Sequence, residues 1–334
     1  MSAGGRAEGE QPRPLRIGAR KSPLAVAQAE YVAGLLAAHG VTSELVGITT
    51  QGDTDRRHLT EIGGTGVFAA AVREALLDGT IDLAVHSMKD LPVAPVPGLV
   101  VAAVPEREDP RDVLVGTTLA GLRSGMVIGT GSPRRRVQLD EYARDRGITL
   151  EFVPIRGNVD RRLSLVRDGE VDATLLAAAG MIRLGRLAEL DLPHQLLPLD
   201  VMAPAAGQAA LALEIRSDAE AWITAAVETT DHPASAATSG AEREFLGAIE
   251  AGCMAPVGVT ARLAGDHART ADLTLSAVIG RTGLSNADDV DPDAPLVRLE
   301  QTVTAGRTRG LARRMADSVL AQLSTNSDQT RESM

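Results

Sequence analysis

Aromatic side chains are scarce in this chain of 334 residues, which contains three Phe, two Tyr and one Trp. Its hydrophobic cores must therefore be built from Ala, Val, Leu and Ile. The same shortage disfavours a platform of stacked rings for single-stranded nucleic acid. A net charge of −10 also argues against a general binder of phosphate backbones. We therefore expect no nucleic acid among the partners of this protein.

Cysteine is limited to Cys253, which excludes a disulfide within the chain. One cysteine and scattered histidines give no zinc-ligand spacing, so we expect no metal site. Walker and GxGxxG motifs are absent, so neither ATP nor NAD is indicated. No apolar run is long enough for a signal peptide or a membrane span. We expect a cytoplasmic protein without a membrane partner, with disordered tails at 1–14 and 324–334.

Lysine is nearly absent, because Lys21 and Lys89 are the only two, and arginine carries almost all the positive charge. The planar guanidinium group of arginine binds carboxylates and phosphates through two parallel hydrogen bonds. A local field of arginines inside an acidic protein therefore indicates an anionic small-molecule ligand.

Hydrophobic residues make up 44% of the chain and charged residues 23%, which is typical of a globular protein. Strands and helices alternate from the start: a strand at 15–19, a helix that begins at Ser22-Pro23, and strands at 44–50 and 81–87. This alternation predicts an α/β fold with a mostly parallel sheet.

The same order of elements then occurs a second time. GMVIGTGSPRRRVQL (125–139) repeats the strand, Ile-Gly, turn, Ser-Pro and helix of LRIGARKSPLAVAQ (15–28). Two α/β lobes are therefore predicted, joined by crossovers at 105–116 and 197–211. Two crossovers are typical of a hinged binder that holds its ligand between the lobes.

The C-terminal part has a different pattern. Three alternating runs between 257 and 306 predict a small antiparallel sheet, closed by a helix from about Arg307 to Leu323. This would be a third, α+β domain. The predicted boundaries are 15–108 with 204–226 for domain 1, 109–203 for domain 2, and 227–323 for domain 3.

Cationic side chains follow five of the predicted strands. In open α/β sheets, ligands bind beyond the carboxyl ends of the strands, where helix N-termini also point. The cations therefore converge on one edge, which predicts a ligand with several carboxylates or phosphates. The structural alternative is that the arginines only form a solvated helix surface and that serines such as Ser22 and Ser132 are only helix caps. The residues concerned are Arg20, Lys21, Lys89, Arg134, Arg135, Arg136, Arg156, Arg161, Arg162 and Arg183.

Two single residues have both a structural and a functional interpretation. Asp90, the one acid in this field of bases, is either a structural ion pair or a carboxylate that accepts ligand N–H groups and exchanges protons. Cys253, in a loop flanked by Gly and Pro, is either a small buried hydrophobe or a reactive thiol. His86 could be a base, but on a strand it is expected to be packed.

From about residue 14 to 322 the chain resembles the porphobilinogen deaminase family. Eight motifs occur in the family's order and end with the lone cysteine in its loop. They are RIGARKSPLAVAQAE (16–30), TTQGDTD (49–55), VHSMKDLP (85–92), IGTGSPRRR (128–136), IRGNVDRRL (155–163), LAAAGMIRLG (176–185), APAAGQAALALE (203–214) and AEREFL…GCMAPVG (241–258).

The resemblance implies two periplasmic-binding-protein-like lobes with mixed, mostly parallel sheets, plus a small α+β domain that carries the cysteine. It implies a monomeric hydroxymethylbilane synthase, a transferase of porphyrin and haem biosynthesis that condenses four porphobilinogen molecules and releases four ammonia. The reaction starts on a dipyrromethane cofactor, which Cys253 would hold through a thioether.

The family's functional residues carry over to this sequence by motif. Asp90 matches the catalytic aspartate, which would bind pyrrole N–H groups and transfer protons. Cofactor contacts fall on Lys89, Asp90, Ser132, Arg134, Arg135 and Arg162, and substrate contacts on Arg20, Ser22, Arg156, Arg162 and Arg183.

The sequence also departs from the family at Thr65, where Lys is common, and at Pro133, where Leu is usual; the additional Arg161 has no assigned role. Two other interpretations remain open. One is a non-catalytic, two-lobed binder of polyanions or solutes. The other is a cysteine-dependent transferase whose thiol is free to react.

Overall fold

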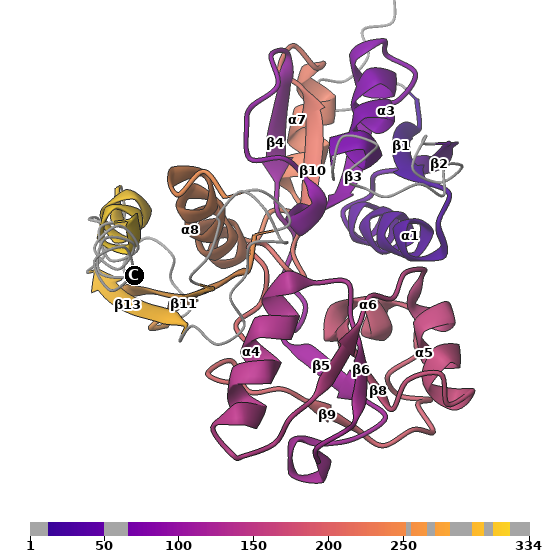
Figure 1. Ribbon diagram of the computed structural model, residues 1–334. Coiled ribbons are helices and arrows are strands. Elements are labelled where there is room, and N and C mark those ends of the chain that lie inside the picture. The colour runs from indigo at the N-terminus through magenta and orange to yellow at the C-terminus, as the bar shows by residue number, and fades with distance from the viewer. Residues whose placement is uncertain are drawn as a thin grey trace, which may run out of the picture. The chain divides into compact units, whose positions relative to one another are not determined.

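The structure is a computed structural model, and it divides into two compact units (Figure 1). The first unit combines Met1–Glu106 with Leu211–His232, and the second combines Arg107–Ala210 with Pro233–Met334. The described residues are 13–49, 66–251, 255–265, 271–280, 296–303 and 310–320, with the backbone alone at 66–68. Thr65, Cys253 and both predicted tails lie outside these ranges, except Arg13 and Pro14.

The first unit contains a five-stranded sheet in the order β2-β1-β3-β10-β4. Strand β1 is parallel to β2 and β3, whereas β10 is antiparallel to β3 and β4. The strands are β1 (Leu15–Arg20), β2 (Ser43–Ile48), β3 (Leu83–Ser87), β4 (Leu99–Ala103) and β10 (Leu211–Arg216), and the helices are α1 (Pro23–Ala38), α3 (Gly66–Leu77) and α7 (Ala221–Glu228).

The second unit repeats this arrangement in the order β7-β6-β8-β5-β9. Strand β6 is parallel to β7 and β8, and β5 is antiparallel to β8 and β9. The predicted internal repeat and α/β class are confirmed. The strands are β5 (Asp112–Val115), β6 (Val127–Gly129), β7 (Glu151–Val153), β8 (Ala173–Ala177) and β9 (His194–Leu196), and the helices are α4 (Pro133–Arg144), α5 (Val159–Arg167) and α6 (Ala178–Arg183).

Each crossover segment leads into the strand that reverses direction. Strand β5 follows the first crossover and β10 follows the second, and both are antiparallel to their two neighbours. Each sheet therefore has two parallel and two antiparallel pairings, so the sheets are mixed, with parallel strands on one side only.

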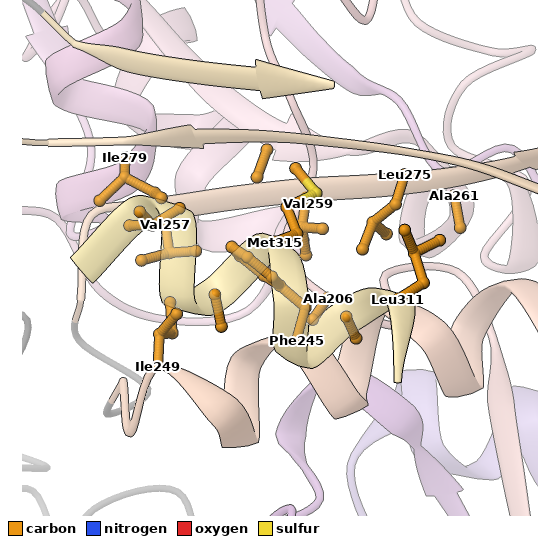
Figure 2. Packing of buried hydrophobic residues seen from close by; sticks show 14 of the residues in the cluster. Ala206, Phe245, Ile249, Val257, Val259, Ala261, Leu275, Ile279, Leu311 and Met315 are labelled. Atoms are coloured by element: carbon orange, nitrogen blue, oxygen red, sulfur yellow. The ribbon is translucent and has the colours of Figure 1, made fainter. Parts of the chain in front are cut away.

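A three-stranded antiparallel sheet completes the second unit, as predicted. Strands β11 (Val257–Leu263), β12 (Leu273–Ile279) and β13 (Val297–Val303) pair in sequence order. Side chains alternate between the faces of a strand, so one face is apolar. Figure 2 shows this face packed against α8 (Pro233–Ala248) and helical residues 311–320, with Phe245, Leu275 and Met315 buried in the shared core.

Helix α8 is fixed within the second unit by a fully buried carboxylate. Glu242 accepts hydrogen bonds from both terminal nitrogens of Arg107, at 2.8 and 2.9 Å, and from the backbone N–H groups of Gly207 and Ala261. Arg107 and Gly207 belong to the two crossover segments, so one acid joins both of them to the three-stranded sheet. The finer three-domain division stays a prediction.

The turn after β5 generates a prediction about stability. Gly116 has a φ of +103°, and a Cβ there would lie 2.2 Å from the backbone oxygen of Asp172. Gly116→Ala should destabilise the protein by about 2–4 kcal/mol, because overpacking adds to backbone strain. Gly125 has a φ of +85° and nothing within 4 Å of its Cβ position, so Gly125→Ala should cost only about 1–2 kcal/mol. Urea unfolding measures both losses, and equal losses would contradict the packing argument.

Candidate functional site

A cavity in the first unit collects several of the predicted site residues. Arg20 ends β1, and Ser22 caps α1 by accepting the N–H of Ala25 at 3.4 Å. Asp90 lies in the short 3₁₀ turn Met88–Asp90 that follows β3. The cavity measures about 80 Å³, several times the roughly 10–15 Å³ that one water needs. Its polar lining consists of Arg20, Ser22, Gln28, His86, Ser87 and Asp90.

The structure decides between the two interpretations of Asp90 only in part. Its side chain is exposed at the cavity, next to the half-buried Lys89. Within the part of the chain that the structure describes, Asp90 makes no ion pair, so the structural alternative finds no support there. An exposed carboxylate beside Arg20 can accept hydrogen bonds from a ligand. The catalytic role itself stays a prediction.

His86 and two further ionisable groups lie beside this cavity. His86 is buried, as expected for a strand residue, and it is also one of the residues that line the cavity. Its Nε2 lies 3.3 Å from Oε2 of Glu214, and Arg73 donates to both oxygens of Glu214 at 2.9 and 2.8 Å. Burial raises the pKa of Glu214, but the neighbouring His86 and Arg73 outweigh burial and lower that pKa to about 2.

The N-terminus of α4 in the second unit gathers another group of predicted residues. Ser132 caps the helix by accepting the N–H of Arg135 at 3.5 Å. Arg134 and Arg135 follow in the first turn, and both are buried. Their guanidinium groups each lie 2.7 Å from an oxygen of Asp112, which is fully buried at the start of β5. Gln208 donates to the same carboxylate at 3.0 Å.

Asp112 thus orients two arginines that the sequence assigns to the cofactor. Burial alone raises the pKa of Asp112, but the charges and hydrogen bonds of Arg134 and Arg135 hold that pKa below its usual range. Each arginine also donates to a backbone carbonyl, Arg134 to Ala203 at 2.7 Å and Arg135 to Leu175 at 3.0 Å. The sequence analysis missed Asp112, which stands out only as the acid that opens the buried run DVLV.

A third arginine adds positive charge to this group. Arg162, in α5, donates to the backbone oxygen of Gly157 at 3.0 Å. Burial and then the charge of Arg135 lower the pKa of Arg162 to about 10, so it remains a cation at neutral pH. Asp112 pairs with two guanidinium groups, and a third lies near enough to Arg135 for their charges to interact. This excess of positive charge favours a ligand with several carboxylates.

The other predicted cations of the second unit have varied surroundings. Arg183 donates to the backbone oxygen of Ala209 at 2.7 Å, within the second crossover. Arg156 is exposed after β7. Arg136 lies over the ring of Phe152, 5.7 Å from its centroid, and Arg161 contacts Ser164 and Glu170. The structure thus gives the side chain of Arg161 only local contacts, within α5 and just after it.

Two groups of predicted residues are therefore brought together, one in each unit. Arg20, Ser22 and Asp90 share the cavity of the first unit, and Ser132, Arg134 and Arg135 share the N-terminus of α4. That both groups face one ligand stays a prediction, as does the role of Cys253, which lies outside the described residues. Gln28, Glu214 and Asp112 complete the two groups and were missed because their neighbours are distant in sequence.

Comparison with known proteins is informative for most of the chain. Residues 15–224 match the family model described as "Porphobilinogen deaminase, dipyromethane cofactor binding domain", and residues 236–289 match "Porphobilinogen deaminase, C-terminal domain". "Porphobilinogen deaminase 1" of Streptomyces coelicolor is 48% identical over 93% of this chain and 96% of its own. "Porphobilinogen deaminase" of Leifsonia xyli is 51% identical over 75% of this chain and 76% of its own.

Among solved structures, an ABC transporter periplasmic substrate-binding protein from Coxiella burnetii is 17% identical, with a TM-score of 0.39 over 65% of this chain and 91% of that chain. This likeness is too distant to carry an argument. Among the described residues, no helix has the length and apolar character that crossing a membrane requires.

The pairing around Asp112 predicts a large loss of stability in Asp112→Asn. The variant leaves two buried guanidinium groups without a counter-charge, and we expect a loss of about 3–5 kcal/mol. The control is Asp109→Asn, because the partly exposed Asp109 pairs with the exposed Arg111, and such pairs contribute less than about 1 kcal/mol. Urea unfolding compares the two variants. A similar small loss in both would show that burial of the Asp112 pair does not stabilise the fold.

Glu214 predicts how stability depends on pH. Its pKa is about 2 in the folded chain against 4.5 without the fold, so its contribution of about 3 kcal/mol is complete above pH 4.5 and is lost as the pH falls toward 2. Glu214→Gln should therefore be less stable at neutral pH and lose less stability between these two pH values. Urea midpoints of both proteins across this pH range test the prediction. If stability falls equally with pH in wild type and variant, Glu214 is not the group responsible.

Proposed function

The chain belongs to the porphobilinogen deaminase family, and on this premise we propose that Asp90 is the catalytic residue of its hydroxymethylbilane synthase reaction. This transferase condenses four porphobilinogen molecules, with loss of four ammonia, into a linear hydroxymethylbilane. The proposal is carried by one observation: an exposed carboxylate shares a small cavity with a cation and a helix cap.

The arginines around α4 support a binding role toward the dipyrromethane cofactor. This group carries several carboxylates, and the excess positive charge around Asp112 fits such an anion. When bound, dipyrromethane supplies the pyrrole carbon to which the first substrate is joined. We assign its thioether to Cys253 and its polar contacts to Lys89, Asp90, Ser132, Arg134, Arg135 and Arg162.

Substrate binding follows the same logic in both units. Porphobilinogen has an acetate, a propionate and an aminomethyl group, and its carboxylates require cationic partners. Asp90 would accept the pyrrole N–H hydrogen bonds and stabilise the positive charge that develops when ammonia leaves. The residues assigned to the substrate carboxylates are Arg20, Ser22, Arg156, Arg162 and Arg183.

The remaining parts of the proposal concern organisation and setting. We propose domains 15–108 with 204–226, 109–203, and 227–323. A monomer that acts in the cytoplasm, independently of nucleic acid, completes the proposal. The family's biosynthetic reaction supports a soluble setting, since its substrate and product are both charged small molecules.

Replacing Asp90 tests the catalytic assignment. Asp90→Asn should retain the dipyrromethane mass but lose at least about 100-fold in kcat, because proton transfer and charge stabilisation are both impaired. Intact-mass spectrometry and a porphobilinogen consumption assay measure the two properties. The control is Asp168→Asn, an exposed acid at the end of α5, which should leave both unchanged.

Replacing the cysteine separates the enzyme from the alternatives. Wild-type protein should be heavier than its sequence by two pyrrole units, and Cys253→Ser should lack this excess. A wild-type mass equal to the sequence would favour the non-catalytic binder, and ready alkylation of Cys253 would favour the cysteine-dependent transferase. A wild-type rate in Asp90→Asn would remove Asp90 from the mechanism.

A further inference from the structure

Three buried ionisable side chains meet beside the cavity of the first unit, and the reaction as assigned so far does not use them. His86 is opposite Ala212 and Glu214 is opposite Ala84 in the pairing of β3 with β10. His86 and Glu214 therefore lie on the same face of the sheet as diagonal neighbours. Arg73 reaches the same carboxylate from α3.

The distance between His86 and Glu214 favours one tautomer of the imidazole ring. A carboxylate can only accept hydrogen bonds, so the 3.3 Å approach of His86 Nε2 to Glu214 Oε2 is favourable when Nε2 carries the hydrogen. In the neutral ring, Nδ1 is then the basic nitrogen. Arg73 keeps the carboxylate ionised, so Glu214 stabilises a proton on the ring without taking it.

The position of His86 at the cavity allows this nitrogen to accept a proton from a bound substrate. His86 lines the cavity together with Arg20 and Asp90, and a side chain at a cavity wall can contact the bound substrate. Each condensation removes a proton from a pyrrole carbon, and this proton needs an acceptor. Under the proposed function, Asp90 transfers protons and also accepts the pyrrole N–H groups, so a second acceptor in the cavity would share the proton transfers of each condensation.

We propose that His86 is a second catalytic residue, which receives this proton at Nδ1 while Glu214 holds the opposite edge of its ring. The inference rests on the proposed function. The aminomethyl group reacts in its ammonium form: the bond between its carbon and nitrogen breaks, and the electron pair leaves with ammonia. The aminomethyl carbon then bonds to the α-carbon of the preceding pyrrole, the electrons of that α-C–H bond return to the ring, and the proton goes to His86 and afterwards to water.

Arg73 and Glu214 are positioning residues in this scheme. Arg73 donates two hydrogen bonds to Glu214, which leaves one edge of Oε2 to the imidazole. The arrangement of Glu214, His86 and the substrate resembles that of the acid, the histidine and the reacting group in hydrolases. There the acid selects the tautomer of the histidine and stabilises its imidazolium form.

The kinetic test uses porphobilinogen deuterated at its free α-carbon. His86→Gln should lower kcat about 100-fold and raise the deuterium isotope effect on kcat above the wild-type value, because proton removal becomes rate-limiting. Glu214→Gln should shift both quantities in the same direction by a smaller factor. The control is His39→Gln, an exposed residue after α1, which should match wild type in both. A lower kcat with an unchanged isotope effect in His86→Gln would reduce His86 to a structural role and overturn the proposal.

A second measurement does not depend on turnover. Nitrogen-15 NMR of histidine-labelled wild-type protein should show the Nε2–H tautomer for the neutral ring of His86, and Glu214→Gln should alter this signal, which His86→Gln identifies by its loss. An Nδ1–H tautomer in wild type would overturn the proposal. Wild-type protein that does not consume porphobilinogen would instead refute the proposed function, so the two failures are distinguishable.

Discussion

A carboxylate shut away from water is stable only where cations and hydrogen-bond donors surround it, and both units of this protein are arranged around such groups. Asp112, Glu214 and Glu242 are almost fully buried, and an arginine reaches each of them at 2.7–2.9 Å. The desolvation of each ion costs several kcal/mol, so the surrounding donors are a condition of the fold.

The charge distribution follows from this arrangement. The chain is acidic as a whole, with a net charge of −10, yet the start of α4 has one acid for three arginines. Asp112 fixes Arg134 and Arg135 in place and neutralises only part of their charge. A polycarboxylate can therefore be attracted locally, while the acidic surface elsewhere discourages other polyanions. Under the proposed function, the buried pairing thus serves both stability and binding.

Local patterns in the sequence predicted the elements well. Serine followed by proline predicted the starts of α1 and α4, because a cap depends on neighbours within three residues, and both serines do accept the expected N–H. Alternation predicted β11, β12 and β13 for the same reason. The reversed direction of β5 and β10 was not predicted, because the pairing of a strand depends on partners far along the chain. The same limit applies to the site: Arg73 and Glu214 are 141 residues apart, and Gln208 is 96 residues from Asp112.

The internal repeat explains how one scaffold carries two different polar centres. In both units a parallel strand leads to a serine-capped helix, and the strand that follows a crossover reverses direction. In both units that reversed strand also supplies the buried acid, Glu214 from β10 and Asp112 from β5. The partners differ: Glu214 holds a histidine and Asp112 holds two cations at a helix start. A duplicated frame can thus carry two different polar centres, because the strand after each crossover sets the position of the acid. The neighbouring strand and helices set its partners: His86 from β3 and Arg73 from α3 in one unit, and Arg134 and Arg135 from α4 in the other.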